Sequence, residues 1–128
     1  MRPNKQILIA AFFLFAQQVF CQAKVPFGIR AEKYATMQSI VKLMDNNAYD
    51  SAEAVITREL LNQNNKLNER EEYFLYCYEA EIMYYNALFD IGMASAKKAL
   101  NLAEKLENDT LIGSAQNLLG LQYMHLET

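Results

Sequence analysis

The sequence predicts an all-α fold in which antiparallel pairs of helices stack as repeats, an α-α superhelix. Three observations predict it. Apolar side chains recur at steps of three and four along most of the chain, which places them on one face of each helix. Short polar stretches rich in Asn, Asp and Gln separate these segments and are typical of turns. Similar residues return at a constant offset of forty positions, which indicates an internal repeat.

The first 23 residues are predicted to form a secretory signal. Arg2 and Lys5 precede an apolar run from Ile7 to Ala16, and the small residue Ala23 marks the expected cleavage point. The run is about half as long as the roughly 20 apolar residues that a membrane span needs. We therefore expect an exported protein, periplasmic or extracellular. The alternative is a membrane-anchored protein that retains this helix.

The charge balance excludes some classes of partner. Two of the 12 basic residues lie in the predicted signal, so ten basic and 15 acidic residues remain, a net charge of -5. An acidic chain without a Lys/Arg cluster is not expected to bind nucleic acid or, after signal cleavage, a membrane surface. Cys77 would then be the one cysteine left, and its apolar helix predicts that it is buried.

Five helices are expected after the signal. Asn68 is predicted to cap the third of them, with Glu69, Glu71 and Glu72 in its first turn, where carboxylates favour the helix dipole and face water. Asp90 is predicted to cap the fourth. The expected segments are a linker at 24–30, helices at 31–44, 51–62, 73–88, 91–106 and 110–126, and polar breaks between them.

The repeat is clearest at the second helix of each pair. Tyr49 and Ala52 have the same spacing as Phe89 and Gly92, so an aromatic residue at the turn is followed by a small residue three places on. The small side chain lets another helix approach closely. Further aligned columns are Leu60 with Leu100, and Ile40 with Ala80 and Gly120.

At these residues the chain resembles the tetratricopeptide repeat family. Tyr49, Ala52 and Leu60 match its pattern in the first unit, although Glu59 stands where the pattern has Ala. The second unit matches at Phe89, Gly92, Ala99 and Leu100, and the start of a third at Leu119, Gly120 and Tyr123.

The resemblance implies two units and part of a third. They would span residues 31–68, 69–108 and 109–128. The period of forty exceeds the family's usual length of about 34 residues and is similar to the variant in exported bacterial sensor and regulator proteins. We therefore expect the N-terminal sensor part, or a fragment, of a larger signalling protein. The alternative is a last helix that caps the array.

No catalytic, cofactor-binding or metal-binding residue is predicted, and an enzyme is not expected. His125 is the only histidine, and the sequence has no Gly-rich phosphate loop and no nucleophile elbow. Glu79 and Glu81 are two residues apart, so their side chains point in different directions and do not form an acid–base pair.

With no catalytic, cofactor or metal site predicted, the remaining candidate function is binding through a surface. In the tetratricopeptide family the first helix of each unit lines a concave groove, and the resemblance implies a protein or peptide partner there. The alternatives are a purely structural helical domain and a self-associating scaffold without a ligand groove. The groove candidates, placed by the period, are Tyr34, Met37, Val41, Met44, Phe74, Glu81, Tyr84, Tyr85, Asn117 and Leu121.

Overall fold

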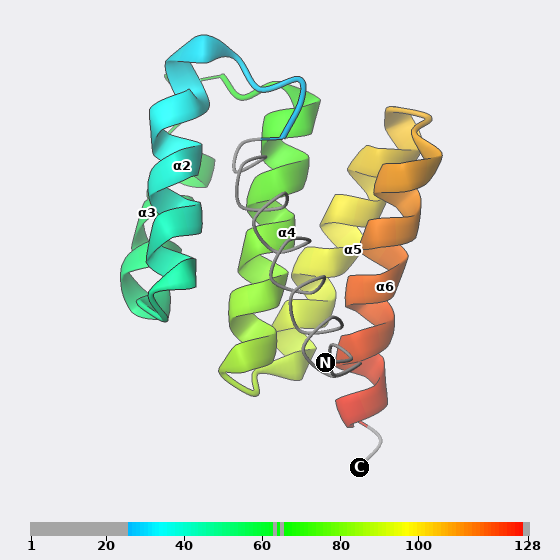
Figure 1. Ribbon diagram of the computed structural model, residues 1–128. Coiled ribbons are helices and arrows are strands. Elements are labelled where there is room, and N and C mark those ends of the chain that lie inside the picture. The colour runs from blue at the N-terminus through cyan, green and yellow to red at the C-terminus, as the bar shows by residue number, and fades with distance from the viewer. Residues whose placement is uncertain (1–25, 63, 65, 127–128) are drawn as a thin grey trace, which may run out of the picture.

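The predicted all-α fold is confirmed. The computed structural model describes residues 26–62, 64 and 66–126, and within them it contains helices and no strand (Figure 1). The predicted signal at residues 1–23 lies outside this part of the chain. The helices are α2 (Ala31–Asp45), α3 (Tyr49–Leu61), α4 (Glu69–Tyr85), α5 (Phe89–Lys105) and α6 (Asp109–Leu126).

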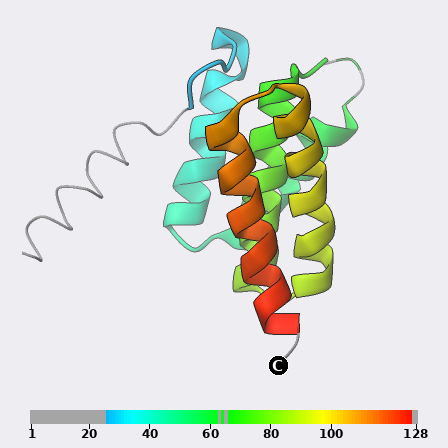
Figure 2. The same ribbon diagram turned by 90° about the vertical axis from the view of Figure 1, so that its right-hand side faces the viewer.

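The helices pack against one another in chain order. The α2–α3 pair contacts the α4–α5 pair through α3 and α4, and α6 packs against both α4 and α5. Figures 1 and 2 together place α2 and α6 on one side of the molecule and α3 and α5 on the other. The first helices of successive pairs therefore lie toward a common side.

The turns within the two helix pairs have the same conformation, forty residues apart. Asn47 and Ala87 both have a φ of 58°, in the left-handed region. The following N–H groups bond back in the same way, Ala48 N to Leu43 O and Leu88 N to Met83 O, each at 2.8 Å. Such bonds satisfy the free carbonyls at a helix end. The turn geometry agrees with the predicted period.

Two clusters of buried side chains hold the helices together. One joins the first pair to α4, and the other joins α4 to α5 and α6. Ile40, Ala52, Ala80 and Gly92 are buried, as the repeat predicts, whereas Gly120, in the same column as Ile40 and Ala80, is exposed. The first cluster contains Met37, Ile40, Ala52, Ile56, Leu75, Ile82 and Met83. The second contains Tyr73, Ala99, Leu102, Ala103, Leu111 and Ala115.

Position 92 has room only for glycine, because a side chain from α6 fills the space where a Cβ would lie. Gln122 is completely buried, and its Nε2 donates to the carbonyl oxygen of Ala80 on α4 at 2.7 Å. A Cβ on Gly92 would lie 2.5 Å from the Cδ and Oε1 of Gln122. The closest approach at Gly92 is therefore to α6.

One predicted helix cap is confirmed and one is wrong. The Asn68 side chain accepts from the N–H of Glu71 at 2.8 Å, and the Glu71 carboxylate accepts from the N–H of Asn68 at 2.9 Å. This is a capping box. Asp90 is not a cap, because α5 begins two residues earlier than predicted, at Phe89, with Leu88 in the cap position and no side-chain bond there.

Candidate functional site

The candidate site is the surface that α2, α4 and α6 form on the side of the molecule toward which all three lie. Two sets of positions related by the forty-residue period lie on it together with Tyr85, and all of them are at least partly exposed. Tyr34 is 44% exposed and Tyr85 is 57% exposed. We call this surface the α2–α4–α6 face, and it consists of Tyr34, Val41, Phe74, Glu81, Tyr85 and Leu121.

Glu81 is the central acidic group of this face. Its carboxylate is partly buried, and burial, followed by the negative charge of Asp45, raises the pKa of Glu81 above its usual range. Its charge also contributes to raising the pKa of Tyr85, after burial of that ring. In the described part of the chain no ion pair to Glu81 is formed. A half-buried carboxylate without a cation is unusual and marks a candidate binding group.

Aromatic rings at the helix ends stack in two equivalent pairs. Tyr49 and Tyr85 stack at 5.3 Å with planes 13° apart, and Phe89 and His125, forty residues later, stack at 4.9 Å with planes 16° apart. Tyr84 packs edge-on to Phe89 and His125, and its hydroxyl is hydrogen-bonded to Nε2 of His125 at 3.2 Å. Tyr84 is therefore a half-buried packing residue between α4, α5 and α6.

Several groove candidates do not lie on the open face. Met37 is 1% exposed and belongs to the first core cluster, and Met44 packs against that cluster. Asn117 is exposed, but its counterpart forty residues earlier, Cys77, packs in the second cluster. Asn117 therefore points away from the core on the outer side of α6. The helix period correctly placed these residues on helices, but Met37 and Met44 face the core and Asn117 is exposed on another side.

Cys77 is only partly buried, packed against the second cluster, although its apolar helix predicts burial. Burial raises the pKa of the Cys77 thiol to about 12. A neutral, shielded thiol is neither a nucleophile nor a good metal ligand near neutral pH.

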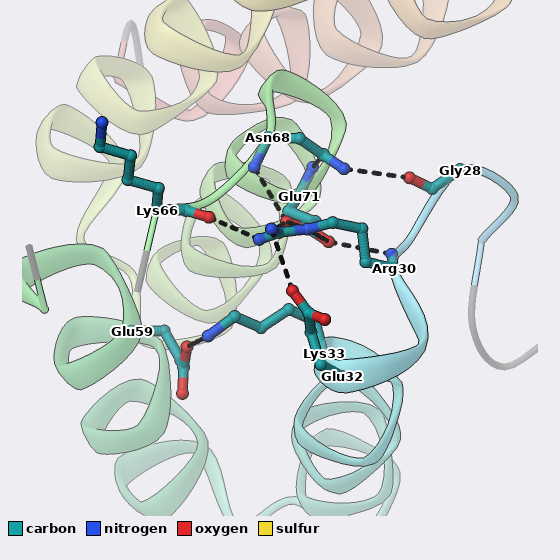
Figure 3. Close-up of polar contacts among 8 residues, drawn as sticks. All are labelled: Gly28, Arg30, Glu32, Lys33, Glu59, Lys66, Asn68 and Glu71. Atoms are coloured by element: carbon teal, nitrogen blue, oxygen red, sulfur yellow. Dashed lines mark hydrogen bonds and ion pairs between the residues drawn. The ribbon is translucent and has the colours of Figure 1, made fainter. Parts of the chain in front are cut away.

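A second polar region lies where the linker and α2 meet α3 and α4 (Figure 3). Arg30 donates from Nε and Nη2 to the carboxylate of Glu71 at 2.8–3.1 Å, and Lys33 Nζ donates to Glu59 at 2.8 Å. The prediction that Glu71 faces water is wrong, because Arg30 lies over it and Glu71 is completely buried. Because these charged side chains pair with one another, they hold the linker and α2 against α3 and α4. None of the four is therefore a candidate for binding a ligand.

Glu59 is also where the chain departs from the family pattern, and the structure explains why. Lys33 and Glu59 form a buried ion pair. Forty residues later the same two positions hold Tyr73 and Ala99, which are both in the second core cluster. The ion pair replaces an apolar contact at the equivalent place.

The described residues contain no group of three or more His, Cys, Asp or Glu side chains arranged to hold a metal ion. Among them no helix has both the length and the apolar character needed to cross a membrane.

Comparison of the chain with protein-family models, curated proteins and solved structures gives no match.

Proposed function

We propose that this protein is a protein-interaction module of the tetratricopeptide-like type. Its α2–α4–α6 face binds an extended peptide that carries a cationic side chain. The observation that carries the proposal is Glu81, a partly buried carboxylate on an open face, with no cation bonded to it in the described residues.

The residues around Glu81 suit a peptide with apolar side chains on both sides of the cation. Val41 and Leu121 stand forty residues before and after Glu81, so the three form one row across α2, α4 and α6. The exposed rings of Tyr34 and Tyr85 add apolar area with a polar edge. Rings of this kind are enriched in binding surfaces because they bury much area with few rotatable bonds.

Charge supports a basic ligand. Asp45 repels Glu81 and contributes to its raised pKa, so a lysine or arginine from a partner would relieve this repulsion. A cation also favours the ionised form of Glu81. Binding is therefore expected to weaken as the pH falls through the raised pKa of Glu81 in the free protein.

The test uses blocked, labelled peptides in which one arginine is flanked by leucines, compared with the same peptides carrying neutral citrulline. We expect the arginine peptide to bind the full chain more tightly, and Glu81→Gln to remove that preference, a loss of about tenfold. The measurement is fluorescence anisotropy at several pH values. Glu79→Gln, two residues away on the same helix, is the matched control and should retain the preference.

Equal affinity for the arginine and citrulline peptides, or an equal effect of Glu79→Gln and Glu81→Gln, would remove the proposal. Tyr34→Ala gives a second check. Tyr34 lies on the exposed face, so its loss should weaken peptide binding and leave the melting temperature nearly unchanged.

The wider cellular role is an expectation from the resemblance and from residues 1–23. On that basis the module would stand at the exported, sensor-side end of a larger signalling protein. The turns, ring stacks and buried columns that recur after forty residues support a tetratricopeptide-like identity.

A further inference from the structure

We propose that the α2–α4–α6 face selects arginine over lysine as the cationic side chain of its peptide ligand. The guanidinium would stack on the ring of Tyr85 while it bonds to the carboxylate of Glu81. This inference rests on the proposed function, since it concerns which cation the same surface prefers. It adds a second determinant, an aromatic ring, to the carboxylate that attracts the positive charge.

Tyr85 and Glu81 are neighbours on α4. They are four residues apart, so their side chains lie one above the other on the same side of the helix. The pKa of Tyr85 is raised first by burial and next by the negative charge of Glu81, which agrees with this spacing. A cation bonded to Glu81 therefore lies beside the ring of Tyr85.

The Tyr85 ring has one side on which a planar group can stack. Tyr49, the first residue of α3, covers the other side, with ring centroids 5.3 Å apart and planes 13° apart. Tyr84 approaches at 5.7 Å with its plane at 74° to that of Tyr85, so this pair meets edge to face. Tyr85 is nevertheless 57% exposed. Its exposed surface therefore includes the side of the ring opposite Tyr49.

A second carboxylate stands near this ring. Asp45 is forty residues before Tyr85 and is the last residue of α2, as Tyr85 is of α4. The charge of Asp45 contributes to the raised pKa of Glu81, so the two carboxylates lie close enough to interact. Helix C-termini carry partial negative charge, so both helix ends add to the attraction for a cation. Lys42, in the last turn of α2, corresponds to the completely buried Ile82 of α4, which faces the first core cluster and not the open face.

This arrangement favours a guanidinium over an ammonium group. A guanidinium is planar and stacks on aromatic rings, and its N–H groups point outward around its edge. It can therefore lie against Tyr85 and still donate to Glu81 from one edge and to Asp45 from another. The ammonium of lysine is a compact charge that holds its water more strongly and has no plane to stack. We expect both cations to bind, and arginine to bind more tightly.

The test compares three blocked, labelled peptides with the full chain by fluorescence anisotropy. They share one leucine-flanked sequence and carry arginine, lysine or citrulline at the centre. We expect the arginine peptide to bind about fivefold more tightly than the lysine peptide, and both to bind more tightly than the citrulline peptide. Tyr85→Leu should bring the ratio of the arginine and lysine affinities close to one. Tyr85→Phe keeps the ring and should retain the ratio.

Tyr123→Leu is the matched control, because it makes the same change at another exposed tyrosine that lies outside the α2–α4–α6 face. It should leave the ratio as it is in the parent. Each ratio is measured within one variant, so a change in the folded fraction alters both affinities equally.

Equal affinity of the parent for the arginine and lysine peptides would overturn this inference. An unchanged ratio in Tyr85→Leu would do the same. In both cases the proposed function stands as long as the two cationic peptides bind more tightly than the citrulline peptide. Equal affinity for all three peptides would remove the proposed function together with this inference.

Discussion

Replacement of Gly92 by leucine is expected to lower the free energy of unfolding by about 3 kcal/mol. The new side chain would occupy the space of the Gln122 amide, which lies 2.5 Å from the position of a Cβ on Gly92. Gln122 is completely buried, so its displacement also breaks the bond from its Nε2 to Ala80 O. The better helix propensity of leucine offsets about 1 kcal/mol of this. Thermal melting followed by circular dichroism measures the change, expected to be about 15 °C.

Gly120→Leu is the matched control, because it makes the same substitution inside a helix where a Cβ meets nothing within 4 Å. It should melt at or slightly above the temperature of the parent. Equal melting of the two variants would mean that α6 does not pack against Gly92.

A double substitution tests the same packing through an expected retention or gain of stability. Forty residues before Gly92 and Gln122 stand Ala52 and Ile82, which are both buried in the first cluster. Gly92→Ala combined with Gln122→Ile therefore copies the chemistry of the first junction. It also removes the buried Oε1 of Gln122, which has no hydrogen-bond partner among the residues that the structure describes. We expect the double variant to be at least as stable as the parent, and more stable than Gly92→Ala alone.

Replacement of Glu71 by alanine is the second large effect, a loss of about 3 kcal/mol of stability. Its carboxylate accepts from the guanidinium and backbone N–H of Arg30 and from the N–H of Asn68. The substitution would remove both the connection between the linker and α4 and half of the capping box. The measurement is unfolding by urea. Glu32→Ala is the control on the same arginine, since Glu32 is exposed, and it should change stability by less than about 1 kcal/mol.

The contact between Arg30 and Glu71 also predicts how the stability of the protein falls at acidic pH. Burial alone would raise the pKa of Glu71, but the hydrogen bonds from Arg30 and Asn68 outweigh it and lower that pKa below its usual range. The pKa of the folded state is therefore lower than that of the unfolded state. The stabilisation is present above the ordinary carboxyl pKa of about 4.3 and is lost as the pH falls through the lowered value. Glu71→Gln should lose less stability over that acid range than the parent does, and an identical loss would contradict the assignment.

Local sequence patterns were sufficient to predict the helices. The spacing of apolar residues, the Asn-rich breaks and the Asn68 cap are features of short segments, and helix formation depends on contacts within a few residues. The forty-residue alignment also predicted that Ala52 and Gly92 are buried, because a small residue in a repeated position indicates close packing. The misplaced Asp90 cap is an error of two residues at a helix start, where sequence signals are weakest.

The sequence by itself therefore determined the all-α class, the positions of five helices and the period that relates them. Only the tertiary structure decided that Glu71 is buried, that Met37 is core and that α6 has an open outer face. Arg30 and Glu71 are 41 residues apart, and Gly92 and Gln122 lie on different helices. Exposure depends on which distant segment lies over a side chain, and no pattern within one helix contains that information.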